Sequence, residues 1–407
     1  IVHSISGDGN NVINKKTVIS DDSYIIEHVF FGAGIPKNDN IFLKWTGGIS
    51  PSEPNIQSTV SGGLTVYTED NQGDSYSHLT TLNSVESLSP VYSEPVGWVA
   101  LWSKYFQKAI TNQDDLKSRV VLVSGPQKIN DQEAEYISTD MIFKYTDVKN
   151  QEFTVNSYIG PIDPEHLSEA SHLDHLFYGK WYSMGPLKRL IIWLLTSLHD
   201  FIPNYGIICI LFAFIIRIFT GPLTKKSFLA NQRMQALQPQ IKKIQDRHKD
   251  DKQKVSQETM ALYKKEGVNP LGGCLPILIQ MPLLIALFQA FQNTIEFRGA
   301  SFLPFWITDL SQPDTIINTP FLADISFIGW IFAKGIALLP IIMGIVMFLN
   351  MKMSSPTTTE GSPKLPMYFM NIFFILLFNT FPSGLNLYYT AYNILNFIQQ
   401  RKLKQSQ

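Results

Sequence analysis

The chain has 407 residues, enough for two domains, and its formal net charge of −1 conceals a strong division. Residues 1–175 carry 11 Lys and Arg against 23 Asp and Glu, whereas residues 176–407 carry 22 against 11. An acidic half joined to a basic, apolar half argues against one uniform globule, and two cysteines in apolar stretches argue against a disulfide framework.

The acidic half contains short runs rich in Val, Ile, Thr, Tyr and Phe, separated by Gly, Asn, Asp and Pro. Examples are TVISDDSYIIEHVFF, GGLTVYTED, RVVLVSG and EFTVNSYIG. This punctuation predicts an all-β sandwich that ends near residue 160.

An acidic connector follows at residues 161–175. Its possible metal ligands recur every three residues: His166, Glu169, His172 and His175. No zinc motif has this form, so a solvated helix is favoured over a metal site.

Residues 176–203 contain an apolar core, LIIWLL, that is too short to cross a bilayer. Its leucines stand at helical spacing, and Pro186 suits a first helical turn. The pattern predicts an amphipathic helix lying on the membrane, with a buried helix of the soluble domain as the alternative.

Five longer apolar segments are compared with the roughly 20 residues that a helix needs to cross hydrocarbon. The predicted transmembrane segments are residues 204–223, 271–293, 332–351, 367–381 and 385–400. The fourth is short, but a Pro-Ser-Gly turn at 382–384 predicts a tight hairpin with the fifth. In the second, the prolines and glycines of NPLGGCLPILIQMP predict a kinked or loosened helix.

The Lys and Arg residues predict the orientation. Eleven of them lie in residues 224–269, whereas the connection 294–331 has Arg298 alone against four acidic residues. Because basic short loops stay in the cytoplasm, five spans place the β domain outside and the C-terminus inside.

Residues 225–267 are predicted to form a basic helical hairpin with its turn at 247–254, since apolar residues recur in it at helical spacing. Docking of a targeting factor, ribosome or substrate is one interpretation. Attraction to anionic lipids and a merely solvated cationic face are the others.

Arg217 is the strongest functional signal, because it lies inside the first span. A guanidinium there costs about 2.5–3.5 kcal/mol on insertion scales, so it should face protein or water. One interpretation is a cation in a polar cavity that attracts acidic groups of a passenger chain. The other is snorkelling toward cytoplasmic headgroups.

Other polar groups lie in the second, fourth and fifth spans. Asn386, Tyr389, Asn393 and Asn396 fall at spacings of 3, 4 and 3, hence on one helical face. Together with Gln280 they predict a wet groove, with hydrogen bonding between helices as the alternative.

Enzymatic motifs are not recognised: there is no Walker loop, no G-x-S-x-G and no H-E-x-x-H, so we expect no enzyme, no cofactor and no metal. A small-solute transporter should show inverted repeats, which we do not find. A carbohydrate enzyme would carry its acid and base in the β domain.

The stretch from Arg217 through GPLTKKSF, ALQPQIKKIQDRHKDDKQKVSQETMALYKKEGVNPLGGCLPILIQMP and on to FPSGLNLYY resembles the bacterial YidC insertases, relatives of the Oxa and Alb proteins. The resemblance covers nearly all of residues 176–407. It implies an insertase and chaperone of the bacterial inner membrane, with a periplasmic β-sandwich and a hydrophilic groove.

The resemblance also implies roles for single residues. Arg217 matches the arginine of the groove, and residues 225–267 match a mobile cytoplasmic hairpin. The positions that match substrate contacts are Leu275, Pro276, Met281, Pro282, Leu283, Leu284, Phe373, Phe374, Tyr388 and Tyr389.

The implied partners are nascent membrane proteins, the ribosome, the signal recognition particle receptor, the Sec translocon and membrane lipids, with no specific nucleic acid. The chain departs from the family pattern at Thr380, where many relatives have tryptophan. The family also carries an N-terminal membrane anchor before the β domain, so we expect Ile1 not to be the natural start.

Overall fold

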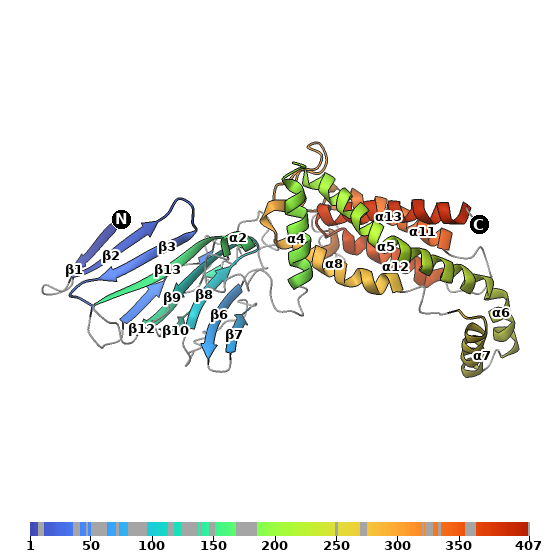
Figure 1. Cartoon of the computed structure of the whole chain (residues 1–407), viewed down its shortest axis with the longest axis horizontal. Coiled ribbons are helices and arrows are strands. Elements are labelled where there is room, and N and C mark those ends of the chain that lie inside the picture. The colour runs from blue at the N-terminus through green and yellow to red at the C-terminus, as the bar shows by residue number, and fades with distance from the viewer. Residues whose placement is uncertain are drawn as a thin grey trace. The chain divides into compact units, whose positions relative to one another are not determined.

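The computed structural model (Figure 1) divides into two compact units, Ile1–Gly179 and Lys180–Gln407. The sequence predicted a boundary between residues 175 and 176. The structure describes all residues except 7–11, 36–40, 46–47, 50–62, 71–72, 80–95, 113–117, 124–136, 139, 146–150, 168–184, 249–250, 269–274, 320, 322–328, 333–334, 355–363 and 406–407.

The first unit is rich in antiparallel β-sheet (Figure 1). Its largest sheet has the order β1-β2-β3-β13-β9-β8-β6-β7, beside sheets β10-β12-β4 and β11-β5. The described elements are β1 Val2–Ser6, β2 Val12–Ile19, β3 Ile25–Phe31, β4 Ile41–Trp45, β5 Gly48–Ile49, β6 Gly63–Asp70, β7 Gly73–Leu79, β8 Val96–Trp102, β9 Phe106–Asn112, β10 Ser118–Val123, β11 Ile137–Ser138, β12 Asp140–Tyr145, β13 Glu152–Pro161 and helix α2 Pro164–Leu167.

Apolar side chains of the two larger sheets meet in one core. Tyr145 of β12 is fully buried together with Val99 of β8 and Phe153 of β13. Leu43 and Trp45 of β4 pack against the same cluster from the three-stranded sheet. Because alternate residues of a strand point to opposite faces, each strand supplies one side to this core. The predicted β-rich fold of this unit is confirmed.

The predicted histidine connector is described only at its start. His166 lies in α2, and its Nδ1 is 2.8 Å from the Asp163 carboxylate. Glu169, His172 and His175 lie outside the described residues. In the described part of the chain, no cluster of His, Cys, Asp and Glu could hold a metal ion.

The second unit is helical (Figure 1). Helix α5 packs against α13, α13 against α11, and α11 against α12. The described elements are α4 Gly185–His199, α5 Tyr205–Ala236, α6 Gln238–Arg247, α7 Lys252–Lys265, α8 Leu275–Asn293, the 3-10 turn η4 Ile295–Phe297, β14 Thr315–Ile317, α10 Gly329–Phe332, β15 Ile336–Ala337, α11 Leu338–Ser354, α12 Lys364–Phe378 and α13 Ser383–Gln405.

Helix α5 exposes an apolar stripe along its length. Asn204 caps the helix, its side-chain oxygen accepting from the Ile207 amide at 3.1 Å. Ile207, Phe214 and Ile218 are about half exposed, at spacings that place them on one face. A polypeptide in water rarely leaves such a stripe uncovered, so this face is suited to lipid.

Among the described helices, α5 is the one that is both long and apolar enough to cross a membrane. Two further apolar stretches, Leu338–Met353 and Tyr368–Phe378, are shorter. Helix α13 is long enough to cross a membrane, at 23 residues, but the amides and tyrosines of its sequence make it less apolar than α5. The five-span arrangement therefore stays a prediction.

Several predicted segment ends differ from the helix ends. The third span was predicted from residue 332, but α11 begins at Leu338, because Gly335 adopts φ +94 and β15 pairs with β14. Ser383 and Gly384 were predicted in the turn and instead begin α13. A side chain at Gly384 would clash with Phe291, which explains the glycine.

The predicted basic hairpin is formed partly by a continuation of α5. That helix runs through Pro222 to Ala236, α6 ends at Arg247, and α7 begins at Lys252, close to the predicted turn. Leu237, Ile241 and Val268 are buried together and join the two arms.

Helix α4 belongs to the helical unit, where it packs against α8 and α5. Ile192 and Leu195 are buried, whereas Leu190 and Trp193 on the other face are more than half exposed. The alternative of a buried helix in the β domain is therefore wrong. An apolar face left exposed on one side agrees with the predicted position at a membrane surface.

Candidate functional site: a buried arginine between two pockets

Arg217 lies on α5 and is only 7% exposed, and its guanidinium is directed toward α13. Nη1 donates to the hydroxyls of Thr224 (3.2 Å) and Tyr392 (3.4 Å). Nη2 donates to the side-chain oxygens of Asn396 (2.8 Å) and Gln399. All four acceptors are neutral, so dipoles solvate the cation without cancelling its charge.

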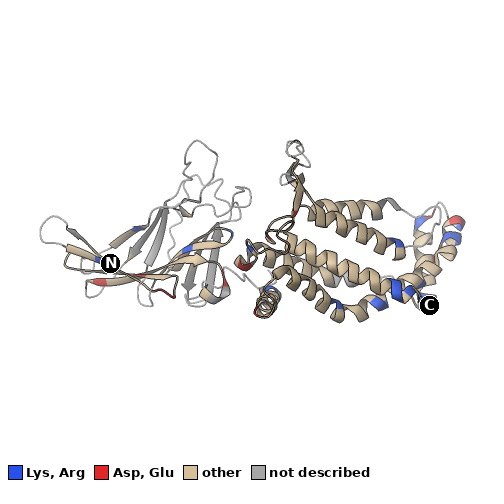
Figure 2. Ribbon diagram, turned by 90° about the horizontal axis from the view of Figure 1, so that it is seen from above, with Lys and Arg blue, Asp and Glu red and all other residues tan. Residues whose placement is uncertain are grey.

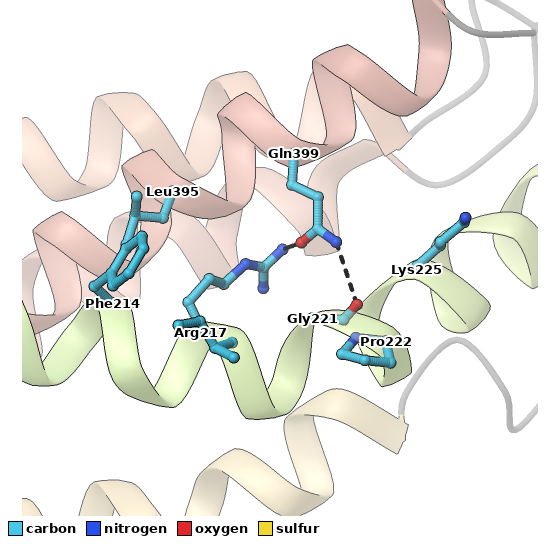
Figure 3. Close-up of a pocket in the computed structure, with 8 residues that line it drawn as sticks. Phe214, Arg217, Gly221, Pro222, Lys225, Leu395 and Gln399 are labelled. Carbon is cyan, nitrogen blue, oxygen red and sulfur yellow. Dashed lines mark hydrogen bonds between the residues drawn. The ribbon is translucent and has the colours of Figure 1, made fainter.

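The surrounding side chains hold the guanidinium in this direction. Gln399, which accepts from Nη2, donates its own amide to the Gly221 carbonyl at 3.3 Å (Figure 3). The ring of Tyr392 lies 5.4 Å from the Arg217 carbon Cζ, within the range of a cation–π contact. The structure does not agree with snorkelling toward lipid headgroups. Both Nη atoms of Arg217 instead donate hydrogen bonds to side chains of the protein.

A pocket of about 260 Å³, here called the amide pocket, lies among five helices. It is lined by Thr224 of α5, Gln280, Met281 and Leu284 of α8, Met343 and Met347 of α11, Phe374 and Phe378 of α12, and Tyr389, Tyr392, Asn393 and Asn396 of α13. The pocket thus combines amides and hydroxyls with methionines, which adapt their shape readily.

A second pocket of about 540 Å³ lies between two helices and is here called the α5–α13 pocket (Figure 3). Arg217 lines this second pocket, whereas its acceptors Thr224, Tyr392 and Asn396 line the amide pocket. The arginine therefore stands between the two pockets, with its charge acting on both.

Three predicted groove residues come together in the amide pocket: Gln280, Tyr389 and Asn393. Asn386 does not, although it belongs to the same helical stripe. It is fully buried and donates to the Phe378 and Phe381 carbonyls at 3.1 and 3.3 Å, so it closes the α12–α13 turn. The helix-bonding alternative holds for Asn386, because it lies in the first turn of α13, just after the chain reverses from α12.

The predicted substrate contacts divide in the same way. Met281, Leu284, Phe374 and Tyr389 line the amide pocket, while Pro282, Leu283, Phe373 and Tyr388 are not among its lining residues. Phe373 is 46% exposed on α12, whereas Tyr388 is fully buried against Phe212. The side chains of Leu275 and Pro276 lie outside the described residues.

Several lining residues were missed as groove residues in the sequence. Thr224 and Tyr392 hold the guanidinium, and Met343 and Met347 come from α11. A signal existed for α13, because Tyr392, Asn396 and Gln399 continue the polar stripe at spacings of 4 and 3. No such signal existed for the methionines, which look like ordinary apolar residues of a span.

Hydrogen bonds close the end of the bundle at which α11 and α13 begin. Asn379 accepts from the Ala337 amide (2.9 Å) and donates to the Ile331 and Gly335 carbonyls (both 2.8 Å). Ser383 donates through its amide to the Gln312 carbonyl at 2.7 Å. This end is therefore tied by directional bonds between segments distant in sequence.

The Asp314 carboxylate caps α11 at the same end. Oδ2 accepts from the Leu338 and Leu339 amides at 3.2 and 2.8 Å. Burial raises the pKa of Asp314 to about 6, although these two hydrogen bonds oppose the change. The folded protein therefore binds the Asp314 proton more tightly than the unfolded chain does.

This shift predicts a pH dependence of stability. Between about pH 4 and 6 the folded state holds the extra proton, so stability falls as pH rises, by roughly 3 kcal/mol at most. The Asp314→Asn variant should lose this slope. Thermal unfolding of both proteins in detergent at pH 4.5 and 7 measures it, and an equal decline in the two would contradict the assignment.

Comparison with known proteins identifies the family of the chain. The family model described as 60Kd inner membrane protein matches residues 197–407. The YidC membrane protein insertase of Chloroherpeton thalassium is 32% identical over 416 residues, covering 100% of this chain and 69% of the relative. That of Prosthecochloris aestuarii is 33% identical over 397 residues, covering 96% and 65%.

A solved structure described as an active YidC insertase crystal structure with the first transmembrane domain resolved has a TM-score of 0.42 and 19% identity. It covers 98% of this chain and 78% of that one. From the sequence matches, the chain belongs to the YidC family of membrane protein insertases, a family of bacterial inner membrane proteins. It spans about two thirds of the length of the two relatives.

Proposed function

We propose that this chain inserts nascent membrane proteins into the bacterial inner membrane and assists their folding, with the amide pocket as the hydrophilic part of the route. One observation carries the proposal. A buried, hydrogen-bonded cation stands beside a mainly apolar cavity among five helices, into which amides and hydroxyls of α8 and α13 also project. Its relatives are named membrane protein insertases, which supports the same activity.

The physical task of an insertase is to lower the cost of moving polar groups into hydrocarbon. An unpaired amide or hydroxyl costs several kcal/mol in an apolar medium, and a charge costs more. Gln280, Asn393 and Asn396 offer a passenger chain replacement hydrogen bonds. Apolar segments of the passenger then partition into lipid, which supplies the driving force without a fuel.

The charge of Arg217 adds selectivity to this route. Its four acceptors are neutral, so its field reaches an acidic group of the passenger, strengthened by the low dielectric of the surroundings. Met281, Leu284 and Met347 line the apolar side of the pocket and suit passengers of varied shape.

We further propose five spans, with the β unit in the periplasm and the C-terminus in the cytoplasm. Figure 2 supports this orientation, since most Lys and Arg of the helical unit gather toward the end that carries the hairpin and the C-terminus. Cytoplasmic segments are rich in such residues. The bonds of Asn379 and Asp314 then lie at the periplasmic end, which suits a groove closed on that side.

The α6–α7 hairpin is proposed to dock cytoplasmic partners. Lys242, Lys243 and Arg247 are exposed on α6, and the apolar cluster of Leu237, Ile241 and Val268 holds the two arms together. A basic surface suits the ribosome or the signal recognition particle receptor. The Sec translocon is proposed as a partner of the membrane helices.

Site-specific crosslinking tests the proposed route. A photoreactive amino acid at Leu284 or Tyr389, both in the amide pocket, should form adducts with a stalled nascent membrane protein. The matched control is Ile345 on α11, which is 57% exposed and is not among the residues that line the pocket. Adducts of equal strength from Ile345 would show contact through lipid only and would contradict the route.

A further inference from the structure

The α5–α13 pocket has the chemistry of an amphiphile site. Figure 3 shows Phe214 and Leu395 at one end and Lys225 at the other, with Arg217 and Gln399 between them. Ile218 and Phe214 are 59% and 49% exposed, so the apolar end faces the same side as the stripe on α5. The pocket therefore changes from apolar to cationic along its length.

The length of α5 would place the cationic end of the pocket at the depth of the lipid headgroups. Lys225 follows Tyr205 by 20 residues, which at 1.5 Å per residue is about 30 Å along α5. The hydrocarbon core of a bilayer is also about 30 Å thick. If α5 begins at one edge of the core, Lys225 reaches the other edge, and the Arg217 guanidinium lies a little below it.

The described lining of the pocket includes two cations and no carboxylate. The Arg217 Nε is buried and has no hydrogen-bond partner among the described residues, although both Nη atoms are used. Because this Nε is buried, the pocket offers a ligand the charge of the guanidinium and not a free donor. Two positive charges beside an apolar channel complement a molecule with an anionic head and a hydrocarbon chain.

We propose that the α5–α13 pocket binds one anionic phospholipid, with its phosphate between Lys225 and Arg217 and an acyl chain along Phe214 and Leu395. This rests on the membrane location of the helical unit and not on the insertase activity. The lipid would hold α5 against α13 from outside, on the far side of Arg217 from the amide pocket.

Native mass spectrometry of the full chain in detergent tests the site, with equal amounts of phosphatidylglycerol and phosphatidylcholine of identical chains. Phosphatidylglycerol should be retained preferentially. Lys225→Gln should lower that preference about fivefold, the effect expected for one cation near a membrane surface. The matched control is Lys226→Gln, which removes an exposed neighbouring charge that is not among the lining residues and should leave the preference unchanged.

Gly221→Leu tests the space of the pocket and leaves both of its cations, Arg217 and Lys225, in place. A Cβ at Gly221 would meet Gln399 at ordinary distances of 3.6 and 3.8 Å, so the variant should fold. It should retain neither lipid, with an unchanged melting temperature in phosphatidylcholine. Equal effects of Lys225→Gln and Lys226→Gln would overturn the proposal, as would displacement of the lipid by inorganic phosphate alone. Insertion activity is not a readout here, so failure of this proposal leaves the proposed function standing.

Discussion

Replacing Arg217 with alanine should lower the insertion of a substrate with an acidic translocated tail about tenfold, which corresponds to a loss of about 1.4 kcal/mol. The reason is electrostatic. A carboxylate within 4 Å of the guanidinium gains up to about 4 kcal/mol at an effective dielectric constant of 20, and much of this is offset by desolvation. Insertion is measured as the protease-protected fraction in reconstituted vesicles.

Two further substitutions separate charge from hydrogen bonding. Arg217→Lys keeps the charge and should retain most of the activity, although it cannot reproduce all four hydrogen bonds, one to α5 and three to α13. Arg217→Gln keeps polar atoms without charge and should behave like alanine. A substrate with a neutral tail serves as the control. Equal insertion of the acidic substrate by all four proteins would remove the electrostatic part of the mechanism.

The largest loss of stability is expected from Asn379→Ala, at about 3–5 kcal/mol. Asn379 is 5% exposed, and its removal leaves the Ala337 amide and the Ile331 and Gly335 carbonyls without this partner. Each buried polar group left unpaired costs about 1–3 kcal/mol. The melting temperature of the detergent-solubilised protein should fall accordingly.

Asn371→Ala provides the matched control, since Asn371 lies on α12 and Asn379 directly follows the end of that helix. Asn371 makes one described hydrogen bond, to the Gly344 carbonyl at 3.3 Å, so its loss should cost about 1 kcal/mol. Asn379→Asp is informative as well, since it keeps an acceptor for Ala337 but no donor for the two carbonyls. Similar melting temperatures for the two alanine variants would show that the bonds of Asn379 do not close this end.

The helical unit could be predicted in outline because its signals are local. Apolar length predicted the start of α5 and the end of α8. The periodicity of Met234, Leu237 and Ile241 predicted the hairpin, whose two arms are held together by a small apolar cluster. The helix ends were less predictable. Helix α11 begins later than predicted because of Gly335 and the pairing of β14 with β15. That pairing joins residues some twenty positions apart, so no local pattern shows it.

The residues of the candidate site could be predicted where a polar or charged residue interrupts an apolar span, and could not be predicted elsewhere. Arg217 stood out because a charge is expensive inside a span, and Gln280 and Asn393 stood out for a related reason. Met343 and Met347 carried no such signal. Their place in the pocket depends on how α11 packs against α13, which no local pattern encodes.

By itself the sequence determined the acidic and basic halves, the β-rich first unit, the apolar helices and the buried arginine, because composition, periodicity and the cost of a charge are properties of residues and their neighbours in the chain. Only the tertiary structure decided that Asn386 closes a turn while Asn393 lines a cavity, and that Arg217 stands between two pockets. Both depend on which helices lie opposite, since a hydrogen bond needs a partner within about 3 Å whatever its distance in sequence.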